Sequence, residues 1–245
     1  SVGHQIDDPL SFDHSGYSFV DILEGTETPK RVAFSPDLSI VSMEKEIAEV
    51  CGRTTTLFAD IGAEVTDEIP DFTGVLEAFQ TLRAVLFATM MEPILKQHRD
   101  RIAPEIIGNI ERGLNIKPSQ IFEAERVRIE LFKKILVFFE THDFLICPAA
   151  SIAPFPVDQR YVTEIDGKPC ETYIDWFSIT FALTMTACPT ISVPCGFTSE
   201  GLPVGVQIMG KPRGEGELLL AAKQFEAAIG ISAQLPITPQ KQKLT

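Results

Sequence analysis

A cysteine at the end of an apolar run has the surroundings in this sequence that most suggest chemistry. Cys195 stands between Pro194 and Gly196, and a thiol exposed at a strand end could act as a nucleophile. A thiol hydrolase also needs a histidine as its base, and no histidine has a neighbourhood that marks it as one. The chain contains His4, His14, His98 and His142. Catalysis by Cys195 therefore remains an alternative to a structural role at a strand end.

Acidic residues between positions 166 and 175 could supply the acid and the base of glycoside chemistry. These residues are Asp166, Glu171 and Asp175. Two of them lie near Gly167 and Lys168 in a polar loop, which favours a solvated surface. The chain offers no histidine or cysteine spacing typical of a metal site, so we expect no metal and no organic cofactor.

A cluster of aromatic and hydroxyl residues begins at the single tryptophan. Its members combine apolar bulk with hydroxyl groups, as the walls of ligand pockets do, although plain core packing explains each of them equally well. We predict a substrate-binding wall formed by Trp176, Phe177, Thr180, Phe181 and Thr184.

The segment that follows this cluster predicts two paired strands. The first strand is expected over 190–193 and stops at Pro194-Cys195-Gly196, and the second runs over 203–209 after a hairpin turn at 198–201. Both runs are mostly apolar with little alternation, which is typical of strands covered on both faces of a sheet.

This stretch resembles the amidase signature family, which has a pattern close to W-x-P-F-T-x-x-x-N-x-T-G-x-P-x-x-S-V-P-C-G followed by G-L-P-V-G-x-Q-I-x-G. The residues in register are Trp176, Thr180, Thr186, Pro189, Ser192 to Gly196, Gly201 to Gly205, Gln207, Ile208 and Gly210. The departures are Ser178 for proline, Ile179 for phenylalanine, Thr184 for asparagine and Ala187 for glycine. A match of this length with fixed spacing is specific for the family.

The resemblance extends to the amino terminus, where residues 3–11 are similar to a segment that follows the catalytic core of the family. It implies amide hydrolysis by two serines and a lysine, with an oxyanion hole in a Gly-Ser-rich loop. The sequence contains no Gly-Ser-Ser-Gly-Gly element, and no lysine sits in a context that resembles the family's base. We therefore expect a carboxy-terminal part of an amidase that lacks its amino-terminal catalytic portion, contains no catalytic residue and is inactive alone. The related subunits of tRNA-dependent amidotransferases share the pattern.

The composition limits the partners. A net charge of −13 argues against a nucleic-acid partner, because such binding needs a clustered basic face. No apolar run is long enough to span a membrane, and the odd number of unpaired cysteines indicates a reducing compartment, so we expect a cytoplasmic protein that acts on a small-molecule amide. A fragment of an enzyme would expose apolar surface and could form homo-oligomers, whereas a stand-alone binding or assembly module would have a complete core.

The remaining pattern predicts one α/β domain over residues 1–245, with a mixed, largely buried sheet flanked by helices on both faces. Residues 1–30 are expected to form a loop and 231–245 a tail. Strands are expected over 31–36, 63–69 and 143–148, the first two parallel across a helix over 43–61 that is capped by Ser42. Further helices are predicted over 72–98, 104–112, 120–141 and 215–230, with a long loop over 149–168.

Overall fold

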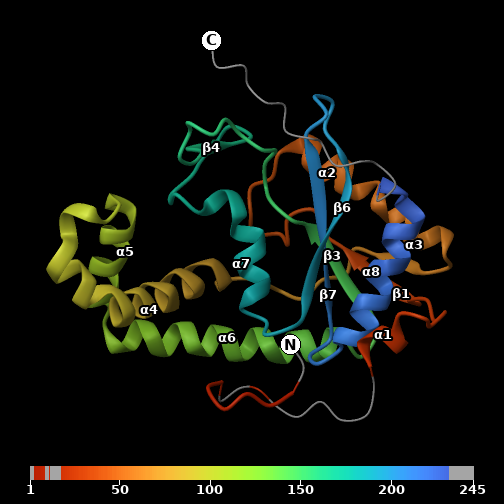
Figure 1. The fold of residues 1–245 in the computed structure, drawn as a ribbon, viewed down its shortest axis with the longest axis horizontal. Coiled ribbons are helices and arrows are strands. Elements are labelled where there is room, and N and C mark those ends of the chain that lie inside the picture. The colour runs from red at the N-terminus through yellow and green to blue at the C-terminus, as the bar shows by residue number, and fades with distance from the viewer. Residues whose placement is uncertain (1–2, 9–10, 12–17, 232–245) are drawn as a thin grey trace.

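The computed structural model describes residues 3–8, 11 and 18–231. Its centre is a mixed sheet of five strands in the order β2-β1-β3-β7-β6 (Figure 1). Strand β1 is parallel to β2 and β3, whereas β7 is antiparallel to β3 and β6. The strands are β1 Arg31–Phe34, β2 Glu64–Thr66, β3 Phe144–Pro148, β6 Thr190–Phe197 and β7 Pro203–Gly210. The expected mixed α/β class is confirmed.

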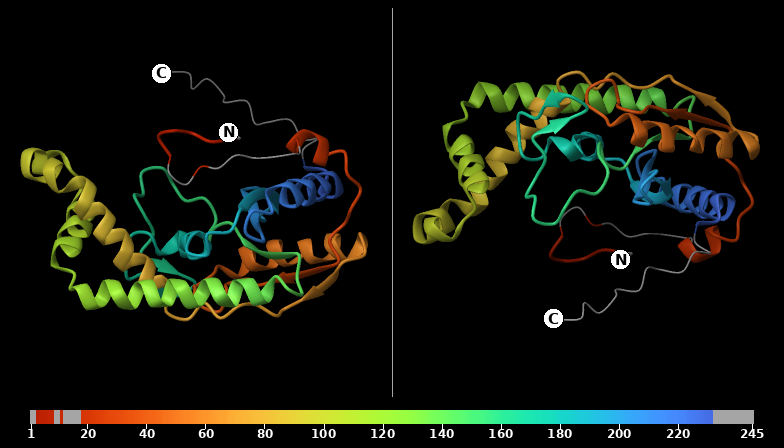
Figure 2. Two further views of the ribbon diagram at one scale, coloured as in Figure 1. Left: turned by 90° about the horizontal axis from the view of Figure 1, so that it is seen from below. Right: turned by 90° about the horizontal axis from the view of Figure 1, so that it is seen from above.

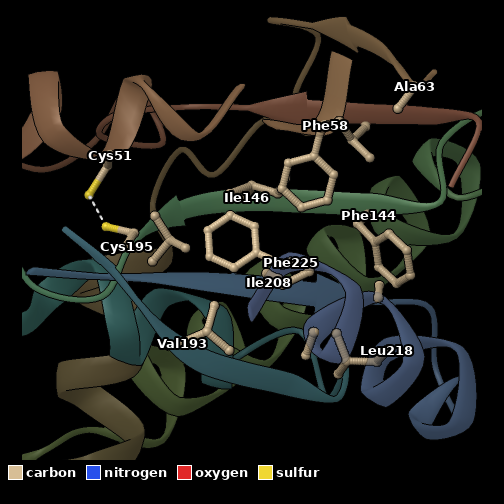
Figure 3. Close-up of a cluster of buried hydrophobic side chains, with 14 of the residues drawn as sticks. Cys51, Phe58, Ala63, Phe144, Ile146, Val193, Cys195, Ile208, Leu218 and Phe225 are labelled. Carbon is tan, nitrogen blue, oxygen red and sulfur yellow. Dashed lines mark hydrogen bonds between the residues drawn. The ribbon is translucent and has the colours of Figure 1, made fainter. Parts of the chain in front are cut away.

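Helices cover both faces of this sheet, as the views from above and below show (Figure 2). The helices of the described residues are α1 Phe19–Ile22, α2 Lys45–Gly52, α3 Thr54–Asp60, α4 Val75–His98, α5 Pro104–Asn115, α6 Pro118–Phe138, α7 Ser178–Thr184 and α8 Glu215–Ile229. Alternate side chains of β3 divide the core. Phe144 and Ile146 pack with α2, α3 and α8 (Figure 3), and Leu145 and Cys147 pack with α4, α6 and α7. This division follows from the period of two along a strand.

The unit from β1 to β2 is the expected parallel crossover, but its helix is broken. The helix predicted over 43–61 is wrong as a single element, because α2 ends at Gly52 and α3 starts at Thr54. The Thr54 hydroxyl donates to the carbonyl oxygen of Cys51 at 2.6 Å, and this local bond competes with a continuous helix. The N-cap is Glu44 rather than Ser42, and it forms no side-chain capping bond.

Strand β6 is the edge of the described sheet and differs from the prediction in two ways. It does not stop before Pro194 but continues to Phe197, with an irregularity in register between Pro194 and Gly196. An edge strand tolerates a proline because one side of its backbone forms no ladder bonds. Burial on both faces is correct for β3, but in β6 the side chains of Thr190, Ser192 and Pro194 are exposed.

The helices α4, α5 and α6 extend away from the sheet (Figure 1). Helix α4 runs through Pro93 to His98, the last residue of the helix predicted over 72–98; the carbonyl freed at exposed Thr89 can bond to water. Helix α5 likewise continues past Gly113 to Asn115. Helix α6 buries only part of its aromatic residues, because Phe122 and Phe132 are exposed while Phe138 is buried.

Short elements lie within the predicted loops. Helix α1 falls in the loop expected over 1–30, and a hairpin of β4 Glu164–Ile165 and β5 Lys168–Pro169 reaches into the loop expected over 149–168. Helix α7 follows within the predicted substrate-binding wall, where no helix was predicted. Most of the predicted tail lies outside the described residues.

The contact between α4 and α5 gives a test of the packing. A Cβ added at Gly113 would lie 2.0 Å from the backbone oxygen of Ala84, whereas one added at Gly108 of the same helix has no neighbour within 4 Å. We expect Gly113→Ala to lower the free energy of unfolding by roughly 1–3 kcal/mol through overpacking. Gly108→Ala should raise it by about 0.5–1 kcal/mol, because alanine favours the helix. Urea unfolding followed by circular dichroism measures both, and equal effects would contradict the packing.

Candidate functional site

The predicted substrate-binding residues occupy one helical stretch, from the short turn η2 Asp175–Phe177 through α7. The Asp175 carboxylate fixes its start by accepting the backbone N–H groups of Glu171 at 2.7 Å and Thr172 at 2.9 Å. Asp166 lies in the turn of the β4–β5 hairpin and is exposed, as is Glu171. Asp175 therefore orders the loop before η2, and the geometry does not support a paired acid and base.

The aromatic members of this stretch pack against each other and against α4. Phe181 stacks on Phe79 with ring centroids 4.1 Å apart and meets Phe177 edge to face at 5.9 Å. Trp176 contacts Phe177 at 4.8 Å and Phe155 at 5.5 Å. Such aromatic pairs hold the rings in fixed orientations and make this part of the structure a rigid wall.

The two threonine hydroxyls have different surroundings. Thr180 donates to the carbonyl oxygen of Ala149 at 2.7 Å, which ties α7 to the chain leaving β3. Thr184 donates to the backbone oxygen of Thr180 at 3.3 Å and is exposed. Thr180 therefore has a structural bond, whereas the oxygen of Thr184 is accessible to a ligand.

Three separate cavities touch three of the five residues. Trp176 lines a mostly apolar one of about 380 Å³ with Phe155 and the start of β7. Phe181 lines a second of about 370 Å³ beneath the β4–β5 hairpin, and Thr184 lines an open groove of about 940 Å³ between α4 and α6. The structure brings the five residues into one wall without placing them around one cavity of the described chain.

Cys195 is buried in the core, and its Sγ lies 3.8 Å from the Sγ of Cys51 on α2 (Figure 3). The hydrogen bond from Cys51 lowers the pKa of the Cys195 thiol, and the same contact together with burial raises the pKa of Cys51. Among the described histidines, His142 bonds to Thr66 and Thr141 at a distant part of the sheet. No described histidine contacts Cys195, so a thiol hydrolase lacks its base in this part of the chain.

Sequence reasoning missed a polar cavity between α4, α5 and the segment 161–173. Its lining includes Arg83, Asn109, Arg112 and Tyr173, which come from three distant parts of the sequence. The only sequence signal was a polar residue, Asn109, at a core-facing position of α5 beside Ile110. Groups of three metal-binding side chains are absent from the described residues, and none of the described helices combines the length and apolar character that a membrane span requires.

Comparison with known proteins identifies the relatives of this chain. The family model described as Amidase matches residues 2–219. An acylamidase of Rhodococcus erythropolis is 27% identical over 223 residues, which is 90% of this chain and 46% of that protein. A glutamyl-tRNA(Gln) amidotransferase subunit of Alkaliphilus metalliredigens is 28% identical over 180 residues, or 71% of this chain and 35% of that protein.

Solved structures of other proteins have a fold similar to that of this chain. A bacterial aryl acylamidase of the amidase signature family superposes with a TM-score of 0.81 at 22% identity, covering 96% of this chain and 52% of that one. The 6-aminohexanoate cyclic dimer hydrolase in complex with substrate gives 0.80 at 19% identity, with the same coverage. The chain thus spans about half the length of the proteins that it matches.

The bond between Thr180 and Ala149 can be tested with a matched pair. Thr180→Val keeps the side-chain shape but removes the donor, and we expect a loss of about 1 kcal/mol in the free energy of unfolding. Thr184→Val removes an exposed hydroxyl and should change stability by less than about 0.5 kcal/mol. Thermal unfolding of both variants is the measurement; equal losses would show that the Ala149 bond does not anchor α7.

The burial of Cys195 predicts its reactivity. Cys170 and Cys188 are partly exposed, whereas Cys51, Cys147 and Cys195 are buried. Iodoacetamide applied to the native chain should modify the first two well before the other three, and peptide mapping by mass spectrometry reports the order. Rapid modification of Cys195 in folded protein would restore the thiol hydrolase as a candidate.

Proposed function

The chain belongs to the amidase family, whose model matches residues 2–219, and we propose that it forms the carboxy-terminal part of an enzyme that cleaves a carboxamide to a carboxylate and ammonia or an amine. The family match over most of the chain is the observation that carries this proposal. The likeness to an acylamidase over 90% of the chain agrees with it. The family as a whole hydrolyses bonds between carbon and nitrogen in amides.

Amide hydrolysis needs an activated nucleophile and donors aimed at the developing oxyanion. The Gly-Ser-rich loop and the lysine that the resemblance implies are not found in the 245 residues. We propose that those groups come from an amino-terminal catalytic portion and that this chain contributes sheet strands and one wall of the pocket. Within that wall, Trp176, Phe177 and Phe181 would present apolar rings, and Thr184 an accessible hydroxyl.

Exposed apolar surface supports the proposal that this chain is part of an enzyme rather than a complete binding module. Several large apolar side chains of α4 and α6 are exposed, among them Leu86, Met90, Ile129, Leu136 and Val137. A stand-alone module would bury such a surface within its own core. Strand β6 also pairs with β7 alone among the described strands, so its other edge can accept a further strand. Both surfaces could instead be covered by a second copy of this chain.

The five cysteines are free thiols in the structure, which fits the proposed cytoplasmic location. A glutaminase role within an amidotransferase complex is the second candidate, because several relatives are named as subunits of glutamyl-tRNA(Gln) amidotransferase. Simple acylamides and glutamine are therefore the two substrate classes to compare.

We expect purified residues 1–245 to release neither amine from an aryl acylamide nor ammonia from glutamine, because the sequence has no Gly-Ser-Ser-Gly-Gly element and no lysine in a context that resembles the family's base. Chromatography of the products and an ammonia assay provide the measurement. The matched control is the native polypeptide, whose intact mass shows whether an amino-terminal portion precedes Ser1. Substrate turnover by residues 1–245 would contradict the proposal that this chain is inactive alone. Loss of that turnover in Cys195→Ala would assign the activity to the Cys195 thiol.

A further inference from the structure

The polar cavity between α4, α5 and the segment 161–173 has a volume of about 340 Å³. Helix α4 contributes Arg83, α5 contributes Asn109 and Arg112, and the segment contributes the rings of Tyr161 and Tyr173. The two tyrosine rings lie 6.2 Å apart between centroids. The cavity thus combines cationic and neutral donors with aromatic walls, which is the composition of a site for a small polar ligand.

Asn109 is the buried donor of this cavity. Asn109 is 8% exposed, and its side-chain nitrogen has no hydrogen-bond partner in the structure. A buried amide N–H without a partner costs roughly 1–3 kcal/mol, and such groups in folded proteins normally have a partner. This nitrogen has almost no solvent-accessible surface, so an acceptor atom of a ligand would satisfy the Asn109 amide once the side chain turns toward the cavity.

Arg83 provides a positive charge in the lining of the same cavity. One guanidinium nitrogen donates to Gln80 Oε1 at 3.5 Å and another to the Tyr173 hydroxyl. The guanidinium carbon lies 4.8 Å from the centroid of the Phe87 ring and 5.3 Å from that of Tyr173. Among the described residues, Arg83 has no acidic partner, so neutral groups hold the guanidinium in place and leave its positive charge uncompensated.

The neighbouring charges are largely paired. Arg112 forms an ion pair with Glu77 at 2.8 Å, and Glu105, which lines the cavity, forms one with Arg160 at 2.8 Å. Glu171 also lines the cavity, but it is exposed, so water screens its charge. The uncompensated charge inside the cavity is therefore that of Arg83.

We propose that this cavity binds the carboxylate of a small aromatic acid. Arg83 pairs with the carboxylate, because charge-assisted bonds to a planar carboxylate suit the guanidinium fork. The Asn109 side chain turns toward the cavity and donates its free amide hydrogen to the same group. The ligand ring lies against Tyr161 and Tyr173. The proposal concerns binding alone and holds whether or not the chain hydrolyses amides.

The test is a calorimetric titration of residues 1–245 with benzoate and, separately, with benzamide, which has nearly the same shape and no charge. We expect benzoate to bind at least about tenfold more tightly than benzamide, which corresponds to one charge-assisted bond. Arg83→Gln should weaken benzoate binding by a similar factor. Asn109→Asp keeps the side-chain shape but adds a negative charge, and it should abolish benzoate binding while retaining the fold.

Arg126→Gln is the matched control, because Arg126 is an exposed arginine on α6 that pairs with Glu123 and lines no part of the cavity. It changes the net charge by the same amount as Arg83→Gln and should leave the affinity unchanged. Circular dichroism establishes that each variant is folded, and if Arg83→Gln is not, Asn109→Asp decides alone. The proposal would be overturned if benzoate does not bind, or if benzamide binds as tightly as benzoate. It would also be overturned if the Arg83 and Arg126 variants lose the same affinity for benzoate.

Discussion

Burial of the central strand pair on both faces is the constraint on which the rest of the structure depends. Every residue of β3 is buried, and most of β7 is too. A strand pair covered in this way needs an apolar layer on each side, which α2, α3 and α8 supply on one face and α4, α6 and α7 on the other. The polar exception obeys the same constraint: buried Gln207 of β7 donates to the carbonyl oxygen of Pro148 at 3.0 Å, so its polar group is satisfied.

The same pair positions the candidate site. The backbone N–H of Ala149, just after β3, donates to the carbonyl of Gly205 at 2.9 Å, so the register of β3 on β7 extends into the following loop. The Ala149 carbonyl then accepts the Thr180 hydroxyl, and the Ser151 N–H donates to the Trp176 carbonyl at 3.0 Å. The aromatic wall is therefore fixed to the centre of the sheet by hydrogen bonds to the backbone of Ala149 and Ser151.

The sequence predicted the structure well where a single physical requirement determines which residues can occupy a segment. Apolar runs predicted β3 and β7 because full burial leaves little choice of side chain, and Gly201 marked the hairpin turn because its φ is +81°. It was uninformative where distant segments meet. The break at Arg53 depends on a local threonine bond, the course of β6 beyond Pro194 depends on its place at an edge, and the cavity around Asn109 joins three segments. None of these has a signature within one window of sequence.

Two open surfaces, the groove that ends at Thr184 and the outer face of β6, lie on the same side of the sheet. Val193 and Cys195 of β6 point into the core formed with α2 and α8, so the exposed side chains of Thr190, Ser192 and Pro194 face the other side. That side is the one covered by α4, α6 and α7, and the apolar groove between these helices ends at Thr184 and Ala187, just before β6 begins. The helical layer thus stops where the edge strand starts, and a single additional body could cover both the groove and this face of β6. We would expect the proposed catalytic portion to pack where the groove meets the outer face of β6.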